Sequence, residues 1–242
     1  YWAASGRPGV DTAFDEGQMK IGRKLATKLL NASKFVLGFG TPPEGATATA
    51  PIDRAMLARL DQVVADATAA FDGYDYARAL EVVEQFFWWF CDDYVELVKG
   101  RAYNGHGPEA ASSALAALRT ALHTVHRLFA PFLPFVTDEV WHWWQQGSVH
   151  GQSWPEPGQH GDAAMLDPVC DTIATIRRSK TEAKVSQKAS VELVVVHGPA
   201  ALLEAVRSAD TDLRDAGSVA EIRYQTSDAD TITVEVTLAP TA

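Results

Sequence analysis

Apolar residues recur every three or four positions through most of the first 145 residues, and this period constrains the fold more than any other feature of the chain. A stripe with that period lines one face of an α-helix, and it must be buried against a neighbouring element. The stripes predict helices over residues 19–37, 52–71, 75–99, 109–129 and 136–144. Pro51 suits the first turn of the second helix, and Asp75 can cap the third. Helices joined by short loops indicate an α-helical bundle.

The pattern changes beyond residue 146, where Gly and Pro become frequent and the helical period is lost. Further helices are predicted over residues 166–184 and 199–208, and β-branched or alternating residues predict strands over 191–197, 221–225 and 231–238. We expect the last two strands to form a β-hairpin. The chain is therefore predicted to be mainly α, with a first segment (1–20), a helical bundle (21–146), a linker (147–165) and a small α+β subdomain (166–242).

Charge is distributed unevenly along the chain. The net charge of −10 argues against a broad nucleic-acid-binding surface. Residues 1–45 nevertheless carry six Lys or Arg against four Asp or Glu. Residues 161–195 carry five basic and five acidic residues, and the five basic residues all lie between 177 and 188. Two local basic patches on an acidic body suit a partner that is contacted at chosen points.

Other features of composition narrow the class of protein. Two cysteines are too few for a disulfide scaffold or a thiolate metal site, so we expect a reducing, cytoplasmic compartment. No apolar run approaches the roughly 18–20 residues that a bilayer span requires, and no membrane contact is expected. The first residues read as though they were cut from the interior of a longer chain.

The first predicted helix has an unusual outer face. Projected at about 100° per residue, its basic residues fall within one arc together with an amide and an aromatic ring: Lys20, Arg23, Lys24, Lys28, Asn31, Lys34 and Phe35. The opposite side carries Ile21, Leu25, Leu29, Ala32, Val36 and Leu37, and is the predicted core face. Cations for phosphates and a ring for a base are typical of proteins that read single-stranded nucleic acid. The alternative is a solvated face with one half-exposed ring at its border.

Catalytic motifs are absent from the sequence, which has no GxxxxGK[ST], GxGxxG, GxSxG or HExxH. His123 and His126 have a spacing that can bind a metal, but they lack carboxylate partners, which weakens the alternative of a helical metal hydrolase. Cys91 has no basic neighbour in sequence that would lower the pKa of its thiol. We therefore predict no catalytic and no metal-binding residues. The aromatic runs at 86–90 and 141–144 fit a bundle core, although Trp88 and Trp89 could meet a second surface.

Four blocks of the sequence resemble the C-terminal part of the valyl-tRNA synthetases, a family of class I aminoacyl-tRNA synthetases. The blocks are SGRPGVDTAFDEGQ (5–18), NASKFVL (31–37), FFWWFCDDYVELVK (86–99) and PFLPFVTDEVW (131–141), and they occur in the family's order and spacing. The last block is shared with isoleucyl and related enzymes, whereas the first two point to valine. An anticodon-binding domain of an isoleucyl- or leucyl-type enzyme is one alternative, and an acidic helical protein-interaction module is another.

The resemblance implies an anticodon-binding bundle whose catalytic and editing domains lie outside this sequence, so that ATP and Mg²⁺ would be needed by the parent enzyme and no cofactor by this part. The expected partners are a valine tRNA and the catalytic domain of the same polypeptide, and we expect a monomer. The anticodon-binding residues it suggests are Asn31, Lys34 and Phe35 in NASKFVL, with Lys24 and Lys28 beside them. Candidate contacts with the RNA backbone are Arg7, Lys20, Arg23, Arg177, Arg178, Lys180, Lys184 and Lys188.

Overall fold

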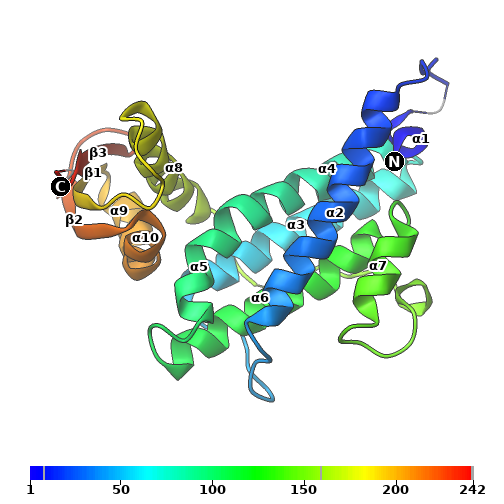
Figure 1. Ribbon diagram of the computed structural model, residues 1–242, viewed down its shortest axis with the longest axis horizontal. Helices are drawn as coiled ribbons and strands as arrows, with labels where there is room; N and C mark the ends of the chain where they lie inside the picture. The colour runs from blue at the N-terminus through cyan, green and yellow to red at the C-terminus, as the bar shows by residue number, and fades with distance from the viewer. Residues whose placement is uncertain (8, 159, 241–242) are drawn as a thin grey trace.

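The protein consists of an elongated helical bundle with a small α+β unit at one end (Figure 1). The computed structural model describes residues 1–7, 9–158 and 160–240. The bundle contains α1 (Trp2–Ser5), α2 (Glu16–Gly38), α3 (Pro51–Asp72), α4 (Tyr76–Trp89), α5 (Val95–Ala102), α6 (Pro108–Phe129) and α7 (Pro134–Trp141). The α+β unit contains α8 (Leu166–Glu182), β1 (Val191–Gly198), α9 (Ala200–Ser208), α10 (Asp210–Gly217), β2 (Val219–Thr226) and β3 (Thr233–Leu238). The predicted fold class, a helical bundle followed by a small α+β unit, is confirmed.

Capping residues explain where several helices begin. The Asp15 carboxylate accepts a hydrogen bond of 2.7 Å from the Gly17 N–H at the start of α2, and the Asp75 carboxylate accepts one of 3.0 Å from the Arg78 N–H at the start of α4. Pro51 occupies the first turn of α3, where its missing N–H costs nothing. The predicted cap at Asp75 and the predicted role of Pro51 are therefore confirmed.

The helix predicted over 75–99 is divided by a π-helical turn, η1 (Phe90–Tyr94), between α4 and α5. Such a turn inserts one residue into the α-helical register. As a result, Phe87 before it, Phe90 at its first position and Val98 after it all face the core. Trp88 and Trp89, which the sequence left open, are half-buried against neighbouring helices.

The inner face of α2 packs on the bundle largely as predicted. Leu25, Leu29 and Val36 are buried, but Ile21 is 39% exposed, so its predicted place in the core is wrong. Near Ile21 the partner of α2 is the Tyr1 ring, which packs so closely on Gly22 that a Cβ there would clash with it. The stripe thus indicates the buried side of a helix, but the neighbouring elements decide how far burial extends along it.

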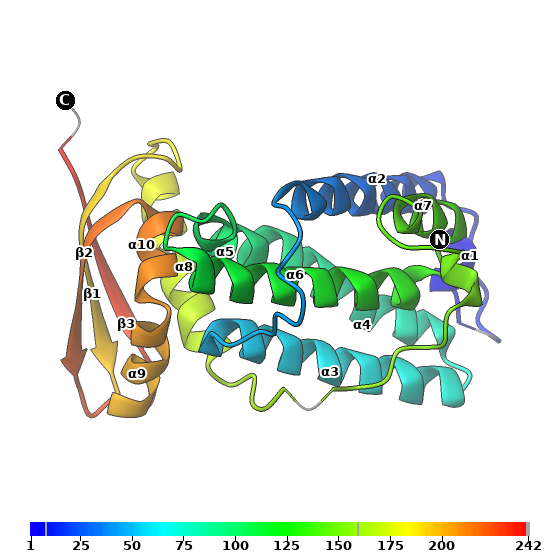
Figure 2. The same ribbon diagram turned by 90° about the horizontal axis from the view of Figure 1, so that it is seen from below.

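The segment that joins the bundle to the α+β unit runs along α3 (Figure 2). It includes a short 3₁₀ turn, η2 (Val149–Gly151), and its other described residues up to α8 form no helix or strand. The Trp154 indole N–H donates to the Thr68 hydroxyl at 2.9 Å, and the Asp61 carboxylate accepts from the Gly158 N–H at 2.7 Å. These bonds hold the segment against α3, despite its lack of regular structure.

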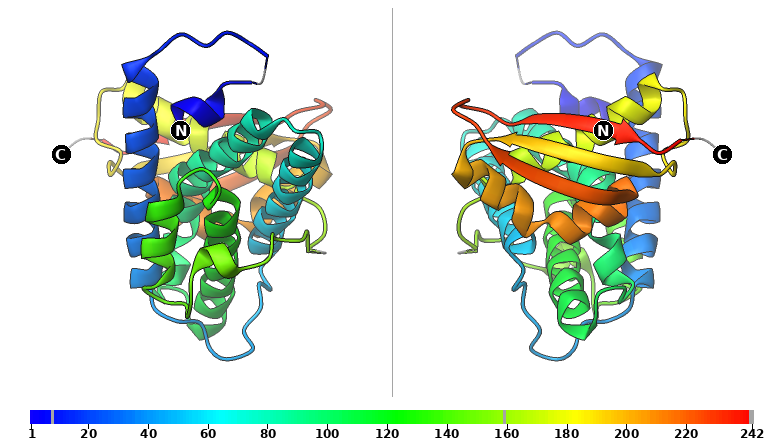
Figure 3. Two further views of the ribbon diagram at one scale, coloured as in Figure 1. Left: turned by 90° about the vertical axis from the view of Figure 1, so that its right-hand side faces the viewer. Right: turned by 90° about the vertical axis from the view of Figure 1, so that its left-hand side faces the viewer.

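The three strands form one sheet in the order β2-β1-β3, with β1 parallel to β2 and antiparallel to β3 (Figure 3). The predicted hairpin between the last two strands is therefore wrong. Val194 and Val196 of β1 are completely buried, and only a central strand can be paired on both edges. The helices α9 and α10 supply the long crossover that a parallel pair requires. They lie with α8 between the sheet and the bundle (Figure 2).

A buried ionic network joins the α+β unit to the bundle. Arg101 of α5 donates from Nη2 to the Asp53 carboxylate of α3 at 2.7 Å, and from Nε to the Asp212 carboxylate of α10 at 2.8 Å. The Tyr94 and Ser113 hydroxyls also donate to Asp53, at 2.7 and 2.6 Å. Although burial opposes it, the two carboxylates raise the pKa of Arg101 above its usual value. The network fixes the position of α10 against α5.

Candidate nucleic-acid interface

The outer face of α2 is open to solvent over most of its length. Asn31, Lys34 and Phe35 are exposed, with Phe35 at 38%. Of the remaining predicted residues on this face, Lys20, Arg23 and Lys24 are exposed and Lys28 is half-buried. The structure therefore presents this predicted set on a single helical surface, with an aromatic ring near its C-terminal end.

A groove separates this face of α2 from the helix that follows the π-helical turn. It has a volume of about 190 Å³, and its walls include Asn31 and Phe35 from α2, Cys91 from η1, and Val95 and Glu96 from α5. Amide, carboxylate and ring thus converge on one concave surface, which can accept a flat polar group such as a nucleobase. Sequence reasoning missed Glu96. Glu96 and Lys99 share one face of α5, and Tyr103 follows on that face directly after the helix; this spacing was the signal that could have found Glu96.

The charges on α2 differ in how they are neutralised. The Lys28 ammonium donates to the Asp92 carboxylate at 2.7 Å and lies 5.4 Å from the centroid of the Trp88 ring. Within the described part of the chain, Lys20, Arg23, Lys24 and Lys34 have no carboxylate within 4.0 Å. Lys28 is therefore held in place by the protein, whereas the other cations can meet an external anion.

Phe35 is held by a second ring. Its centroid lies 4.8 Å from that of Phe39, and the two planes meet at 66° in an edge-to-face contact. This contact orients Phe35 and leaves part of the ring accessible beside the groove. An oriented aromatic surface is what base stacking requires.

The second basic patch, on α8 and the loop after it, is partly used by the fold. Arg177 donates to the Asp93 carboxylate at 2.7 Å, while Arg178, Lys184 and Lys188 are exposed. Lys180 is 1% exposed, and its ammonium donates to the backbone carbonyls of Gln187 at 2.9 Å and Gly217 at 2.6 Å. The predicted contact of Lys180 with RNA is therefore wrong, because its charge serves buried carbonyl groups.

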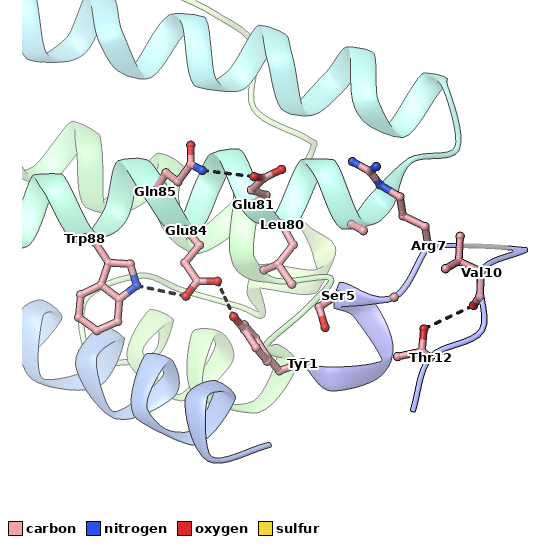
Figure 4. A pocket seen from close by; sticks show the side chains of 12 residues that line it. Tyr1, Ser5, Arg7, Val10, Thr12, Leu80, Glu81, Glu84, Gln85 and Trp88 are labelled. Atoms are coloured by element: carbon pink, nitrogen blue, oxygen red, sulfur yellow. Dashed lines mark hydrogen bonds between the residues drawn. The ribbon is translucent and has the colours of Figure 1, made fainter. Parts of the chain in front are cut away.

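Another cavity, of about 700 Å³, lies between the first residues and α4 (Figure 4). Glu84 lines it and accepts hydrogen bonds from the Tyr1 hydroxyl at 2.8 Å and from the Trp88 indole at 3.1 Å. Glu81 adds a second carboxylate, and Arg7 at the rim lies 3.6 Å from the Asp75 carboxylate. The acidic lining disfavours phosphate in this cavity.

The groups weighed for catalysis have ordinary structural surroundings. Burial raises the pKa of the Cys91 thiol to about 12, which opposes formation of a thiolate. His126 is buried, its Nε2 lies 2.9 Å from the Ser33 hydroxyl, and burial lowers its pKa to about 3. Across the described ranges, no three His, Cys, Asp or Glu side chains are placed to hold a metal ion. Over the same ranges, no helix is both long and apolar enough to cross a bilayer.

Comparison with known proteins identifies the family to which the chain is related. A model of the family described as the anticodon-binding domain of tRNA ligases matches residues 53–195. The chain is 54% identical to a valine–tRNA ligase of Thermobifida fusca over 99% of its length, and 51% identical to one of Salinispora tropica over 98%. It is 49% identical to that of Leifsonia xyli, also over 98%. It spans 28% to 30% of the length of these relatives. Helix α2 precedes the span matched by the family model.

Proposed function

Because the chain belongs to the family of anticodon-binding domains of tRNA ligases, we propose that it recognises the anticodon of a valine tRNA. The observation that carries this proposal is the position of Phe35, which is exposed beside a groove and oriented by Phe39. It lies near the end of a helix on which Lys20, Arg23, Lys24 and Lys34 have no carboxylate partner among the described residues. In this mechanism Phe35 stacks on an unpaired anticodon base. Stacking of this kind contributes on the order of 1–3 kcal/mol per base.

The groove supplies groups that can discriminate between bases. Asn31 has both a donor and an acceptor in its amide, and Glu96 on the opposite wall accepts hydrogen bonds when ionised. Bases that carry matching groups on their edges are favoured, while others leave these polar groups unpaired. The valine tRNA implied by the resemblance carries A and C at the last two anticodon positions, and we propose that these bases are read here.

The exposed cations on α2 supply affinity that does not depend on sequence. Lys24 and Lys34 neutralise phosphates of the anticodon loop, while Lys20 and Arg23 lie nearer the start of the helix and meet the stem. Binding through phosphates releases counterions, so the affinity must fall as the salt concentration rises. Outside α2 and the exposed residues of the second basic patch, the acidic balance of the chain disfavours contact with RNA.

Binding of the chain to a valine tRNA transcript tests the proposal, with the same RNA carrying two altered anticodon bases as the comparison, at two salt concentrations. We expect tighter, salt-sensitive binding to the unaltered RNA. Phe35→Ala should weaken that binding about ten-fold or more. Phe135→Ala is the matched control, since Phe135 is 89% exposed on α7 and lies away from the groove. Equal binding to both RNAs would contradict anticodon recognition, and flat salt dependence would favour a protein-interaction module.

The proposal extends to the whole protein of which such a chain is part. Relatives named valine–tRNA ligase are more than three times its length, and we propose that the same activity, the joining of valine to its tRNA with ATP and Mg²⁺, resides in a catalytic domain outside this chain. The chain then contributes recognition and needs no cofactor of its own. We further propose that it acts as a monomer in the cytoplasm.

A further inference from the structure

A second exposed ring lies next to the candidate site. The centroid of Tyr103 is 4.7 Å from that of Phe39, with the planes at 78°, so Phe39 stands in edge-to-face contact with Phe35 on one side and Tyr103 on the other. Tyr103 follows the last residue of α5 and is 63% exposed, whereas Phe39 is half-buried. Three rings at the C-terminal ends of two helices therefore form a continuous aromatic row whose two ends face solvent.

The backbone around Tyr103 is fixed. The Tyr103 N–H donates to the Lys99 carbonyl at 2.9 Å and ends α5. The next two N–H groups, of Asn104 and Gly105, donate to the Arg101 and Gly100 carbonyls at 2.8 and 3.0 Å. Asn104 adopts a φ of 62°, which closes the turn. Because the turn and the Phe39 contact both hold Tyr103, little conformational entropy is lost when a ligand stacks on it.

Packing within the described residues does not explain why the Tyr103 ring is exposed. Its ring contributes to the core only through Phe39, and in the described part of the chain its hydroxyl has no hydrogen-bond partner. Lys99, one turn before Tyr103 on α5, has a side chain that is 42% exposed and is paired with Glu96 at 2.7 Å in a contact that solvent screens. An open ring beside a cation suits a nucleotide, which brings both a π face and a phosphate.

We propose that Tyr103 is a second stacking residue, which holds the unpaired nucleobase next along the strand from the base on Phe35. Phe39 separates the two rings, so the two bases are splayed onto separate surfaces instead of stacking on each other. Lys99 is then placed to meet the phosphate between them once it leaves Glu96. This inference rests on the proposed anticodon recognition and extends it from one stacked base to two.

The test uses valine tRNA transcripts that carry 2-aminopurine at successive anticodon-loop positions, one per transcript, because the fluorescence of this base is quenched when it stacks. Tyr103→Leu keeps an apolar contact with Phe39 but removes the π face, so we expect a loss of affinity of about 5- to 100-fold and dequenching at one loop position. Phe35→Ala should dequench the adjacent position. Tyr103→Phe should bind within about two-fold of the wild type, since stacking needs only the ring.

Tyr74→Leu is the matched control, because Tyr74 is 86% exposed in the turn between α3 and α4 and lies outside the aromatic row. It should change neither affinity nor fluorescence. If Phe35→Ala weakens binding while Tyr103→Leu binds like the wild type, the second stacking residue is excluded and anticodon recognition stands. Dequenching at the same position in both variants would also overturn the proposal of two bases. If the wild type fails to distinguish the two anticodons, the proposed function itself fails.

Discussion

Helices α2 and α8 both carry a cluster of basic residues in the sequence, yet the structure uses the two clusters differently. On α2 the cations Lys24 and Lys34 extend into solvent without a nearby carboxylate among the described residues. In the α8 cluster, Lys180 is buried on two carbonyl groups and Arg177 is paired with Asp93. A cluster of Lys and Arg residues therefore predicts a binding face only where no carboxylate or carbonyl group of the protein pairs with their side chains.

The difference follows from what covers each helix. The outer side of α2 is covered by no other element of the described chain, whereas α8 lies between the bundle and the three-stranded sheet (Figure 2). Enclosure turns a flexible cation into a fixed donor for buried carbonyls. Arg101 is the extreme case, because it is buried and donates to two carboxylates. Each of the following variants tests the contrast between cations that the protein pairs and cations that face solvent.

Arg101→Met should have the largest effect. It leaves the Asp53 and Asp212 carboxylates buried without their cation, and breaking a buried pair in this way costs about 3–5 kcal/mol. The free energy of unfolding from urea denaturation measures the loss. Arg78→Met is the control, since its pair with Glu81 is half-exposed and contributes at most about 1 kcal/mol. Equal losses in the two variants would show that the network does not bind the α+β unit to the bundle.

Lys180→Met should lower the free energy of unfolding by about 1–3 kcal/mol, because the Gln187 and Gly217 carbonyls lose their donor. Its affinity for RNA and the salt dependence of binding should not change. Lys184→Met, at an exposed position after the same helix, should leave stability within about 0.5 kcal/mol. If Lys180→Met has an unchanged free energy of unfolding but binds RNA with a weaker dependence on salt, Lys180 contacts RNA after all.

Acid should lower the free energy of unfolding through His126, a residue of α6 that lies against Ser33 on the inner side of α2. Burial lowers its folded pKa from 6.5 to about 3, so the unfolded chain binds the extra proton between these values. This contribution to stability is therefore complete above pH 6.5, and it is lost at up to about 1.4 kcal/mol per pH unit as the pH falls towards 3. Urea denaturation at pH 7 and pH 5 should show the loss, and His126→Gln should reduce it. An equal loss in that variant would assign the effect to other groups.

Removing the positive charges of Lys24 and Lys34 on the outer side of α2 should have the smallest effect, confined to the salt dependence of RNA binding. Lys24→Met with Lys34→Met should reduce the slope of log affinity against log salt by about 0.7 for each phosphate that the variant leaves without a cation, while stability stays unchanged. Arg178→Met with Lys188→Met, both exposed in the α8 cluster, provides the direct comparison. A larger fall in slope for the second pair would mean that α8, and not α2, carries the main contact with phosphate.

Much of the candidate site could be predicted from residues close together in sequence. The period of α2 placed Asn31, Lys34 and Phe35 on one exposed face, because residues three and four apart share a face of any α-helix. Glu96 and Tyr103 were missed, since they lie on and directly after another helix, beyond a π-helical turn that shifts the register. Only the packing of α5 beside α2 brings them next to Phe35 and Phe39.

The sequence by itself determined the long helices of the bundle, the cap at Asp75 and the strands of the C-terminal unit, because local propensity and hydrophobic period act over a few residues. The tertiary structure alone decided that β1 lies between β2 and β3, since strand order depends on which partner buries Val194 and Val196. It also decided which cations stay free. Whether a lysine meets solvent, a carboxylate or a carbonyl depends on residues distant in sequence, and no local pattern encodes that contact.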